Sequence, residues 1–261
     1  MRAEHHDDLA EQVRRDGHCI LPSLFPKSLI TEWHRHFEPR LRSHIEREGH
    51  AQNRGGARYY VTLPFEPPFA DPFVFADPDI LAIVDRLVGP DTVMCQLATD
   101  TPLMGSDYQE WHRDAPPLFP EWGRETPPFQ LAVNVPLVDV TERNGPLETT
   151  RGTHLMPRDE ALEKVRRGEI PVERVLMHAG DVMIRDVRTI HRGTPNRTEE
   201  SRPMVVIGYS RRWLHRPEVS IRIPRSTWDH LDEEHRHLLR FNQVVTELGQ
   251  ETGEVYQNFA Y

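Results

Sequence analysis

Two histidines and an aspartate in this sequence have the types and spacing of a metal centre. His112 and Asp114 are separated by one residue, and His191 follows 79 positions after His112. An Fe(II) ion that activates dioxygen needs its protein ligands on one face only, and two imidazoles with one carboxylate provide this arrangement. The same ligand set also suits a catalytic zinc ion with one open position. The three residues therefore predict a catalytic metal site.

The His-x-Asp pattern is weak by itself, because the chain has 15 histidines and repeats the pattern at His5, His6 and His230. The first two copies lie in a polar N-terminal segment, and the third lies in an acidic, helix-like run. His112 instead follows a strand-like stretch, residues 92–98, and shortly precedes a Pro-Pro pair that cannot continue a helix. This context selects the copy at His112 and places it in a loop at the rim of a barrel.

The third ligand has to come from a distant strand that folds alongside the first two. His191 ends the strand-like run 181–190, where we expect a strand to give way to a loop. Arg202 begins the next strand, and a planar guanidinium at that position can bind a carboxylate through two parallel hydrogen bonds. The alternative for His191 is a hydrogen bond within a turn. The alternative for Arg202 is a surface ion pair with Glu199 or Glu200.

Composition limits the kind of partner that this chain can have. The 261 residues carry a net charge of -9, which argues against a nucleic-acid surface, since phosphate binding depends on a basic face. Cys19 and Cys95 are the only cysteines and form no Cys-x-x-Cys motif, as is typical of a reducing compartment. We find no signal peptide and no run of 18 apolar residues. We therefore expect a cytoplasmic protein with a small-molecule partner and no membrane contact, and its oligomeric state stays open.

The patterns of apolar residues predict helices followed by many short strands within one domain, residues 1–261. A helical N-terminal part, about 1–52, precedes a β-rich core, about 92–213, and a C-terminal helical extension, about 214–261. Repeated short alternating stretches favour an antiparallel sandwich or barrel. We expect helices at 5–16, 27–47, 77–88, 159–167 and 225–247, and strands at 17–22, 57–62, 92–99, 129–138, 146–149, 173–178, 182–185 and 203–210.

Several short motifs follow one another in a characteristic order over about residues 9–213. They are Trp111-His112-Arg113-Asp114, Pro136-Leu137-Val138-Asp139, Asn144-Gly145-Pro146-Leu147, Arg151-Gly152-Thr153-His154, Gly180-Asp181, and His191-Arg192-Gly193-Thr194-Pro195-Asn196 up to Arg202. In this order and spacing the chain resembles the phytanoyl-CoA dioxygenase family. The resemblance implies a mainly β fold with flanking helices, the cupin-like double-stranded β-helix or jelly roll.

The resemblance also implies a chemistry. Fe(II) would be held by His112, Asp114 and His191, 2-oxoglutarate would be the cosubstrate, and Arg202 would bind its distal carboxylate. Dioxygen would then be used to hydroxylate an unactivated carbon, with release of succinate and CO2. Desaturation and ring closure remain open as outcomes. Related halogenases have a small residue in place of the aspartate, so Asp114 favours hydroxylation over halogenation.

Two amides are further candidates for contact with the cosubstrate or substrate. Asn134 lies on the opposite face of its strand from Val133 and Val135, so it can point inward. Gln96 alternates in the same way on the strand before His112. The alternative for each is an ordinary strand amide that is hydrogen-bonded in the core.

Other residues near the motifs read more simply as structure. Trp111 could form a wall of the site, although packing is the more common role of an aromatic residue there. His154 and Asn196 match motif positions that we interpret as loop and turn residues. The loops 50–76 and 115–128 are expected to cover the pocket and set the substrate.

Within the first of these loops, Arg54, Arg58, Tyr59 and Tyr60 could recognise an acidic or aromatic group, but a solvated basic loop is the more common explanation. The founding fatty-acyl-CoA activity is not carried over, because the sequence ends without a Ser-Lys-Leu type peroxisomal signal. Two other functions also stay open, a zinc-dependent hydrolase or isomerase and a non-catalytic jelly-roll binding protein.

Overall fold

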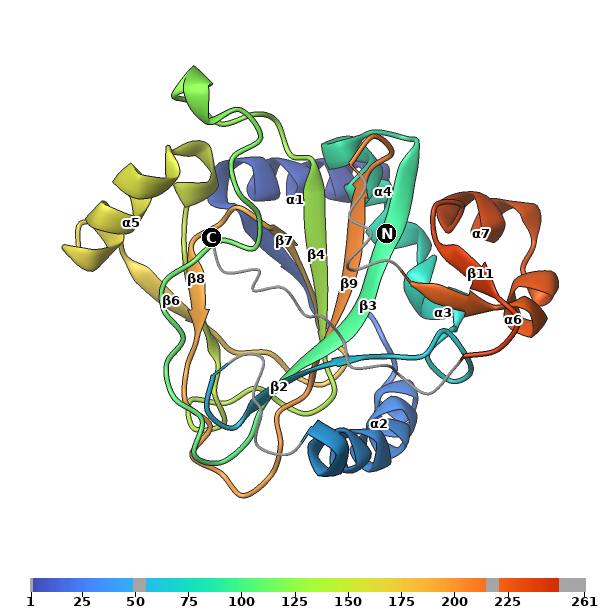
Figure 1. Ribbon diagram of the computed structural model, residues 1–261. Helices are drawn as coiled ribbons and strands as arrows, with labels where there is room; N and C mark the ends of the chain where they lie inside the picture. The colour runs from blue at the N-terminus through green and yellow to red at the C-terminus, as the bar shows by residue number, and fades with distance from the viewer. Residues whose placement is uncertain (1, 49–54, 215–220, 249–261) are drawn as a thin grey trace.

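Six antiparallel strands form the larger of two facing sheets in the computed structural model, which describes residues 2–48, 55–214 and 221–248. The strand order is β1-β7-β4-β9-β3-β2, so strands far apart in sequence are neighbours (Figure 1). The strands are β1 (His18–Leu21), β2 (Arg58–Thr62), β3 (Thr92–Pro102), β4 (Gln130–Pro136), β7 (Val182–Asp186) and β9 (Met204–Arg211).

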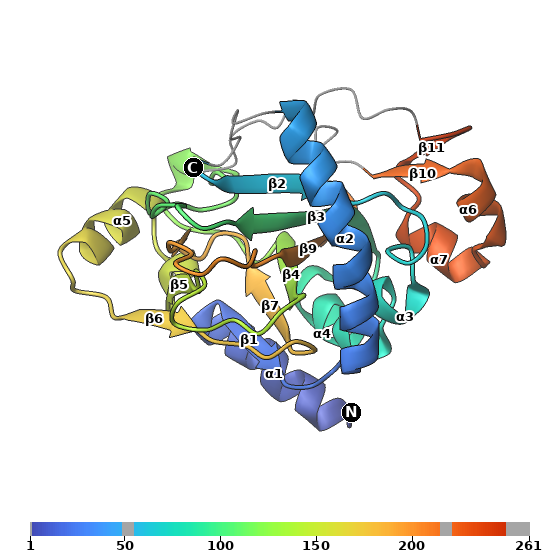
Figure 2. The same cartoon turned by 90° about the horizontal axis from the view of Figure 1, so that it is seen from below.

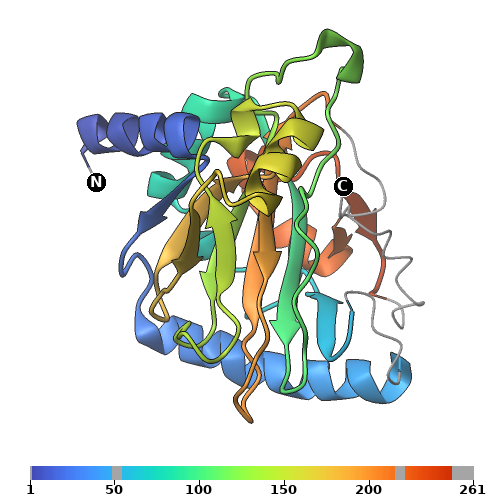
Figure 3. The same cartoon turned by 90° about the vertical axis from the view of Figure 1, so that its left-hand side faces the viewer.

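A smaller antiparallel sheet lies opposite the larger one and has the order β6-β5-β8. Its strands are β5 (Leu147–Thr150), β6 (Val172–Val175) and β8 (His191–Gly193). Figure 3 shows this sheet from its outer side. The sheets are joined by a small apolar cluster in which Val175 and Met177 pack with Met183 and Met204 of the larger sheet. Two facing antiparallel sheets with flanking helices are the predicted jelly-roll architecture.

The larger sheet divides its side chains between helices on one face and a pocket on the other. On β4, Leu131, Val133 and Val135 belong to the main hydrophobic core, whereas Ala132 and Asn134 line the pocket. Strands alternate in this way because successive side chains point to opposite faces. The helices on the outer face are α1 (Ala3–Asp16), α2 (Lys27–Glu48), α3 (Pro72–Phe75) and α4 (Pro78–Val88), as Figures 1 and 2 show.

Helix α4 shows how local sequence sets these boundaries. The side chain of Asp77 accepts hydrogen bonds from the backbone N–H groups of Asp79 and Ile80, and Pro78 occupies the first helical position. Both features are typical of a helix start. Gly89, with φ of +96°, ends the helix in a conformation that other residues rarely adopt. The remaining short helices of the β-rich core are η1 (Pro120–Trp122), η2 (Thr153–Leu155) and α5 (Arg158–Arg166).

The prediction of one helix over residues 225–247 was wrong. The segment instead forms α6 (Arg225–His230), α7 (Glu233–Leu238) and β11 (Gln243–Val245), and β11 pairs in parallel with β10 (Arg222–Pro224). The first helix stops because Leu231 is extended, and the Asp232 side chain then caps the second helix by accepting from the His235 N–H. The rest of the predicted extension, residues 215–220 and 249–261, lies outside the described residues. Across the described chain, no helix combines the length and apolar character needed to cross a membrane.

Candidate metal centre

The two predicted histidine ligands are direct partners across a backbone bridge. The N–H of His112 donates to the carbonyl of His191 at 3.1 Å, and the N–H of His191 donates back at 3.1 Å. Two residues further on, the N–H of Asp114 donates to the carbonyl of Val187 at 2.9 Å. The segment between β3 and β4 is therefore hydrogen-bonded along the connection between β7 and β8, which brings residues 79 positions apart side by side.

The predicted position of His191 within its strand needs a correction. The strand β7 ends at Asp186, a turn follows, and His191 begins the separate three-residue strand β8 rather than ending the earlier run. The turn is closed by a hydrogen bond of 3.0 Å from the Thr189 N–H to the Asp186 carbonyl. A strand of three residues has too little alternation to be recognised from sequence.

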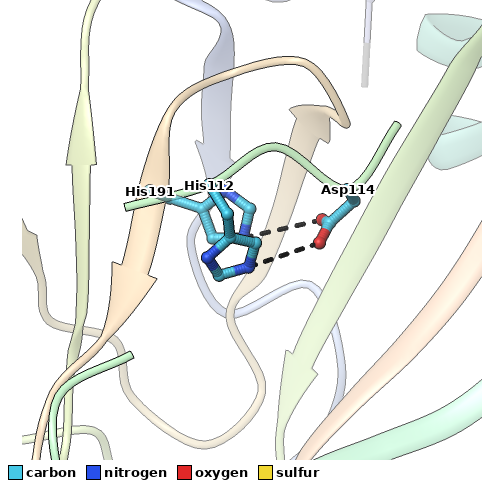
Figure 4. Close-up of side chains that lie close together, drawn as sticks. All are labelled: His112, Asp114 and His191. Atoms are coloured by element: carbon cyan, nitrogen blue, oxygen red, sulfur yellow. Dashed lines mark ion pairs between the residues drawn. The ribbon is translucent and has the colours of Figure 1, made fainter. Parts of the chain in front are cut away.

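The three candidate ligands converge on one point (Figure 4). Nε2 of His112 lies 3.7 Å from Oδ1 of Asp114, and Nε2 of His191 lies 3.6 Å from Oδ2 of the same carboxylate. One ligand atom from each residue lies within 4.8 Å of the others, and the imidazole centroids are 4.4 Å apart. These separations leave room for a single ion between the three side chains.

Hydrogen bonds to the backbone orient both imidazoles. Nδ1 of His112 lies 2.7 Å from the Glu110 carbonyl oxygen, and Nδ1 of His191 lies 2.9 Å from the Thr189 carbonyl oxygen. A carbonyl can only accept, so each Nδ1 carries a proton, and in a neutral ring the lone pair then lies on Nε2, on the side of Asp114. Burial, followed by the nearby charge of Arg185, lowers the pKa of His191 well below its usual value. A neutral imidazole of this kind is ready to bind a divalent metal ion.

Arg185 is a component of this site that the sequence reading missed. It lies on the pocket face of β7 and is buried, with Nη2 2.5 Å from Oδ2 of Asp114 and Nη1 3.2 Å from Nδ1 of His191. The sequence contained a signal for Arg185, since a charged residue two positions after Met183 lies on the same face of the strand and needs an interior polar partner there. With this partner, one carboxylate oxygen of Asp114 is hydrogen-bonded and the other remains for a metal ion.

The candidate ligands lie in a pocket between the sheets that also contains Arg202. Its guanidinium is buried, Nη2 donates to the Gly145 carbonyl at 2.7 Å, and Nε has no hydrogen-bond partner among the described residues. Burial lowers the pKa of Arg202 to about 10, partly opposed by the charge of Asp100. The structure records no ion pair between Arg202 and Glu199 or Glu200 within the described ranges. A buried guanidinium with donors to spare is suited to an incoming carboxylate.

Asn134 and Gln96 both line the same pocket. Asn134 is 7% exposed, and its Oδ1 has no hydrogen-bond partner in the described part of the chain. The Nε2 of Gln96 donates to the hydroxyl of Tyr60 at 2.7 Å. The inward orientation predicted for both amides is therefore observed, and Asn134 keeps an acceptor for which the described residues offer no donor.

The interpretation of residues 58–60 as a solvated basic loop was wrong. These residues form β2, and Arg58, at 1% exposure, donates to Oδ2 of Asp100 at 2.9 Å and to the Thr194 carbonyl at 2.8 Å. Tyr59 belongs to the core, and Tyr60 lines the pocket. Arg58 can be buried because a carboxylate and a backbone carbonyl from distant parts of the chain accept hydrogen bonds from its guanidinium. Arg54 lies outside the described residues.

Three neighbouring residues have structural contacts, as expected. Trp111 packs against a small apolar cluster, and the guanidinium carbon of Arg192 lies 4.4 Å from its ring centroid. Nε2 of His154 is 3.0 Å from the Arg14 carbonyl, and Nδ2 of Asn196 donates to two backbone carbonyls. None of the three lines the pocket.

The donor set and its surroundings fit a divalent metal ion with open coordination positions. Two imidazoles with oriented Nε2 atoms and one carboxylate converge from a single side, and the pocket continues from them toward Arg202. The family model described as phytanoyl-CoA dioxygenase (PhyH) matches residues 13–204. The chain belongs to the phytanoyl-CoA dioxygenase family. Members of this family use Fe(II), 2-oxoglutarate and dioxygen.

Solved structures of other enzymes share the fold of this family member. The non-heme α-ketoglutarate-dependent epimerase SnoN from nogalamycin biosynthesis is 21% identical, with a TM-score of 0.59 over 80% of this chain and 84% of that one. The carbocyclase SnoK from the same biosynthesis is 19% identical, with a TM-score of 0.60 over 81% and 86% of the two chains. HygX from Streptomyces hygroscopicus, solved with nickel, 2-oxoglutarate and hygromycin B, is 17% identical, with a TM-score of 0.57 over 79% and 88%.

Proposed function

We propose that this chain is a hydroxylase: an Fe(II)- and 2-oxoglutarate-dependent dioxygenase that hydroxylates an unactivated carbon of a small-molecule metabolite and releases succinate and CO2. The observation that carries the proposal is that the His112, Asp114, His191 cluster and the buried Arg202 line the same pocket. We also infer that the whole chain serves this activity as one domain. Cys19 and Cys95 form no disulfide in the described part of the chain, which supports a reducing, cytoplasmic location.

In this proposal the three clustered residues hold the iron, and the rest of the pocket binds and orients. Bound Fe(II) together with 2-oxoglutarate supplies the activation of dioxygen. Arg202 binds the distal carboxylate of 2-oxoglutarate, because its unpartnered Nε and its buried charge favour an anionic acceptor. Arg185 keeps Asp114 oriented through the hydrogen bond to Oδ2. The facing sheets limit access of water to the reacting groups.

We assign the two amides to the same binding function. Asn134 lies between two core residues of β4 and faces the pocket on the other side of the strand. There its carboxamide can form hydrogen bonds with the cosubstrate or the substrate. Gln96 is held in place by Tyr60, which leaves its Oε1 to accept from a substrate hydroxyl or amine. Gly208 makes this position possible, since a Cβ there would lie 2.8 Å from the Cβ of Gln96.

Hydroxylation is favoured over halogenation because Asp114 is present and is held by Arg185. Epimerisation and ring closure use the same cosubstrate in SnoN and SnoK, so the product distinguishes them. A zinc hydrolase or isomerase has no need for a buried guanidinium at the far end of the pocket. A non-catalytic binding protein does not require two imidazoles that backbone hydrogen bonds orient around one carboxylate.

The test is to add Fe(II) and 2-oxoglutarate to the protein without oxygen and then to supply oxygen with a panel of candidate metabolites. We expect a visible charge-transfer band before oxygen is added, and succinate in proportion to a product that has gained one oxygen atom. A product of unchanged mass would indicate epimerisation, and a product that has lost two hydrogens would indicate desaturation or ring closure. Activity with zinc and no visible band would replace the proposal with the hydrolase.

A further inference from the structure

Four buried charged side chains form a continuous network directly behind the candidate metal centre. Nη1 of Arg113 is 2.7 Å from Oε1 of Glu125, Nη1 of Arg188 is 3.4 Å from Oε2 of Glu125, and Nη2 of Arg188 is 2.7 Å from Oδ2 of Asp186. The side-chain exposures are 0%, 5%, 1% and 0% for Arg113, Glu125, Arg188 and Asp186. None of the four lines the pocket, so the proposed reaction does not use them.

The four residues come from the segments that carry the candidate ligands and from one surface loop. Arg113 lies between His112 and Asp114, and its side chain points away from the cluster that these two form. Asp186 is the last residue of β7, and Arg188 lies in the connection that leads from β7 to His191. Glu125 lies on neither segment but near the C-terminal end of the loop 115–128, which leads to β4.

Glu125 therefore joins the two ligand-bearing segments from outside the pocket. One carboxylate oxygen contacts the guanidinium from the His112 segment, and the other contacts the guanidinium from the His191 segment. The guanidinium groups are also fixed to the backbone. Arg113 donates to the carbonyls of Thr153 and Met156 at 2.6 and 2.7 Å, and Arg188 donates to the carbonyl of Thr126 at 2.6 Å.

The network contains two guanidinium groups and two carboxylates, so its formal charges balance. Burial alone would raise the pKa of Asp186, but hydrogen bonding and charge from Arg188 outweigh it, and the pKa is lowered. Buried ion pairs give little net stability compared with apolar packing, because desolvation cancels most of the attraction, but removing one partner is costly. Such a network is better suited to fixing a geometry than to stabilising the fold.

The loop 115–128 is anchored only near its two ends. It begins directly after Asp114, and near its roots Ala115, Leu118 and Phe129 pack with Val187. Its tip extends away from the sheets (Figure 1), and Phe119 and Trp122 are exposed and stacked on each other, with ring centroids 4.4 Å apart. The Glu125 side chain, which is 5% exposed, thus anchors the loop next to its exposed tip.

We propose that Glu125 is a positioning residue for the metal centre, which sets the separation of the His112–Asp114 segment from the segment that leads to His191. This inference rests on the metal centre of the proposed function. Glu125 contacts neither the ligand side chains nor the pocket, so its effect passes through Arg113 and Arg188. Changes to groups that orient metal ligands typically cost about 10- to 100-fold in metal affinity or activity. We expect a loss in that range when the carboxylate is replaced.

The test compares Glu125→Gln with Glu121→Gln, since Glu121 lies on the same loop and is exposed. Both variants lose one negative charge, but only the first replaces one of two oxygens that accept from guanidinium groups by an NH2 group, which cannot accept. The apoproteins are titrated with Co(II), following its visible absorption, and their melting temperatures are recorded. We expect Glu125→Gln to bind Co(II) about 10- to 100-fold more weakly with an altered spectrum, and Glu121→Gln to match the wild type.

A lower melting temperature for Glu125→Gln with unchanged Co(II) affinity and spectrum would overturn the proposal, because the role would then be structural only. Should Glu125→Gln not fold, Glu125→Asp takes its place. It keeps the charge but is too short to span both guanidinium groups, so wild-type Co(II) affinity in that variant would also overturn the proposal. Failure of the wild type to bind Co(II) is a separate result, which would refute the metal centre itself.

Discussion

Nη2 of Arg185 donates a 2.5 Å hydrogen bond to Oδ2 of Asp114, so the only carboxylate of the candidate metal centre is paired with a buried guanidinium. This pair fixes the direction in which the other oxygen, Oδ1, points. It also places a permanent positive charge next to the metal position, where burial of His191 already favours neutral imidazole. The geometry of the centre is therefore prepared by the protein before an ion binds.

We predict that Arg185→Gln weakens binding of Fe(II) or Co(II) by about 10- to 100-fold, because the carboxylate loses the partner that orients it. Metal titration of the apoprotein measures this effect. Arg174→Gln is the matched control, since Arg174 makes two carboxylate contacts on the surface and none in the pocket. Equal metal affinity in the two variants would show that Asp114 is oriented without Arg185.

Arg202 gives a prediction about the cosubstrate rather than the metal. Arg202→Ala should weaken binding of 2-oxoglutarate by about 2–5 kcal/mol, as expected when one partner of a buried charged hydrogen bond is removed. Metal affinity should stay unchanged, because Arg202 contacts none of the three candidate ligands. The exposed Arg197→Ala serves as the control. Calorimetric titration of the metal-loaded protein with 2-oxoglutarate decides the matter, and an unchanged affinity would remove Arg202 from the binding site.

The sequence predicted those features that depend on local pattern or on pairs of motifs. Alternation along the strands was sufficient to place Asn134 and to predict an antiparallel sandwich or barrel. The resemblance to the family implied the jelly roll and brought His112 and His191 together. The burial of Arg58 was missed, because it depends on Asp100 from another strand and on a backbone carbonyl 136 positions away. Tertiary contacts of this kind leave no periodic signal in the sequence.

The outer side of the histidine bridge carries a second contact that can be tested. The guanidinium carbon of Arg192 lies 4.4 Å from the ring centroids of both Trp111 and Tyr108, and its Nε donates to Oε2 of Glu148 at 2.8 Å. Trp111 precedes His112 and Arg192 follows His191, so their contact supports the backbone hydrogen bonds between the two histidines. Cation–π contacts contribute about 0.5–2 kcal/mol each.

We predict that Arg192→Lys, which keeps the charge but loses the planar stacking surface, lowers the free energy of unfolding by about 1–2 kcal/mol. Arg174→Ala removes contacts to Glu148 and Glu142 without touching the aromatic rings, and should cost less than Arg192→Lys, because ion pairs of an exposed side chain contribute little. Urea unfolding of both variants measures the difference. Equal losses would assign the stability to the ion pair with Glu148 rather than to stacking.

Asp186 predicts how stability depends on acid. Its pKa in the folded protein lies below the ordinary value of 3.8, so the folded state releases this proton more readily than the unfolded state. The resulting stability is present above about pH 4 and is lost as the pH falls through the lowered folded pKa. Asp186→Asn should therefore be less stable at pH 6 and should show a shallower decline of the unfolding free energy below pH 4. Asp159→Asn, at an exposed position, should keep the wild-type slope, and an equal slope in Asp186→Asn would contradict the assignment.

We predict that position 193 has to be glycine because a side chain there would clash with the guanidinium of Arg58, and not because of the backbone conformation. A Cβ at this position would lie 2.5 Å from Nη1 and 2.6 Å from Cζ of Arg58, whose buried contacts to Asp100 and Thr194 prevent it from moving aside. Gly193→Ala should therefore lower the free energy of unfolding by about 1–3 kcal/mol, the usual cost of overpacking. In an Arg58→Ala background the same change should cost much less, because the clashing atoms are gone. Chemical denaturation of the two single variants and the double variant gives the coupling energy, and strictly additive losses would show that the two residues do not interact.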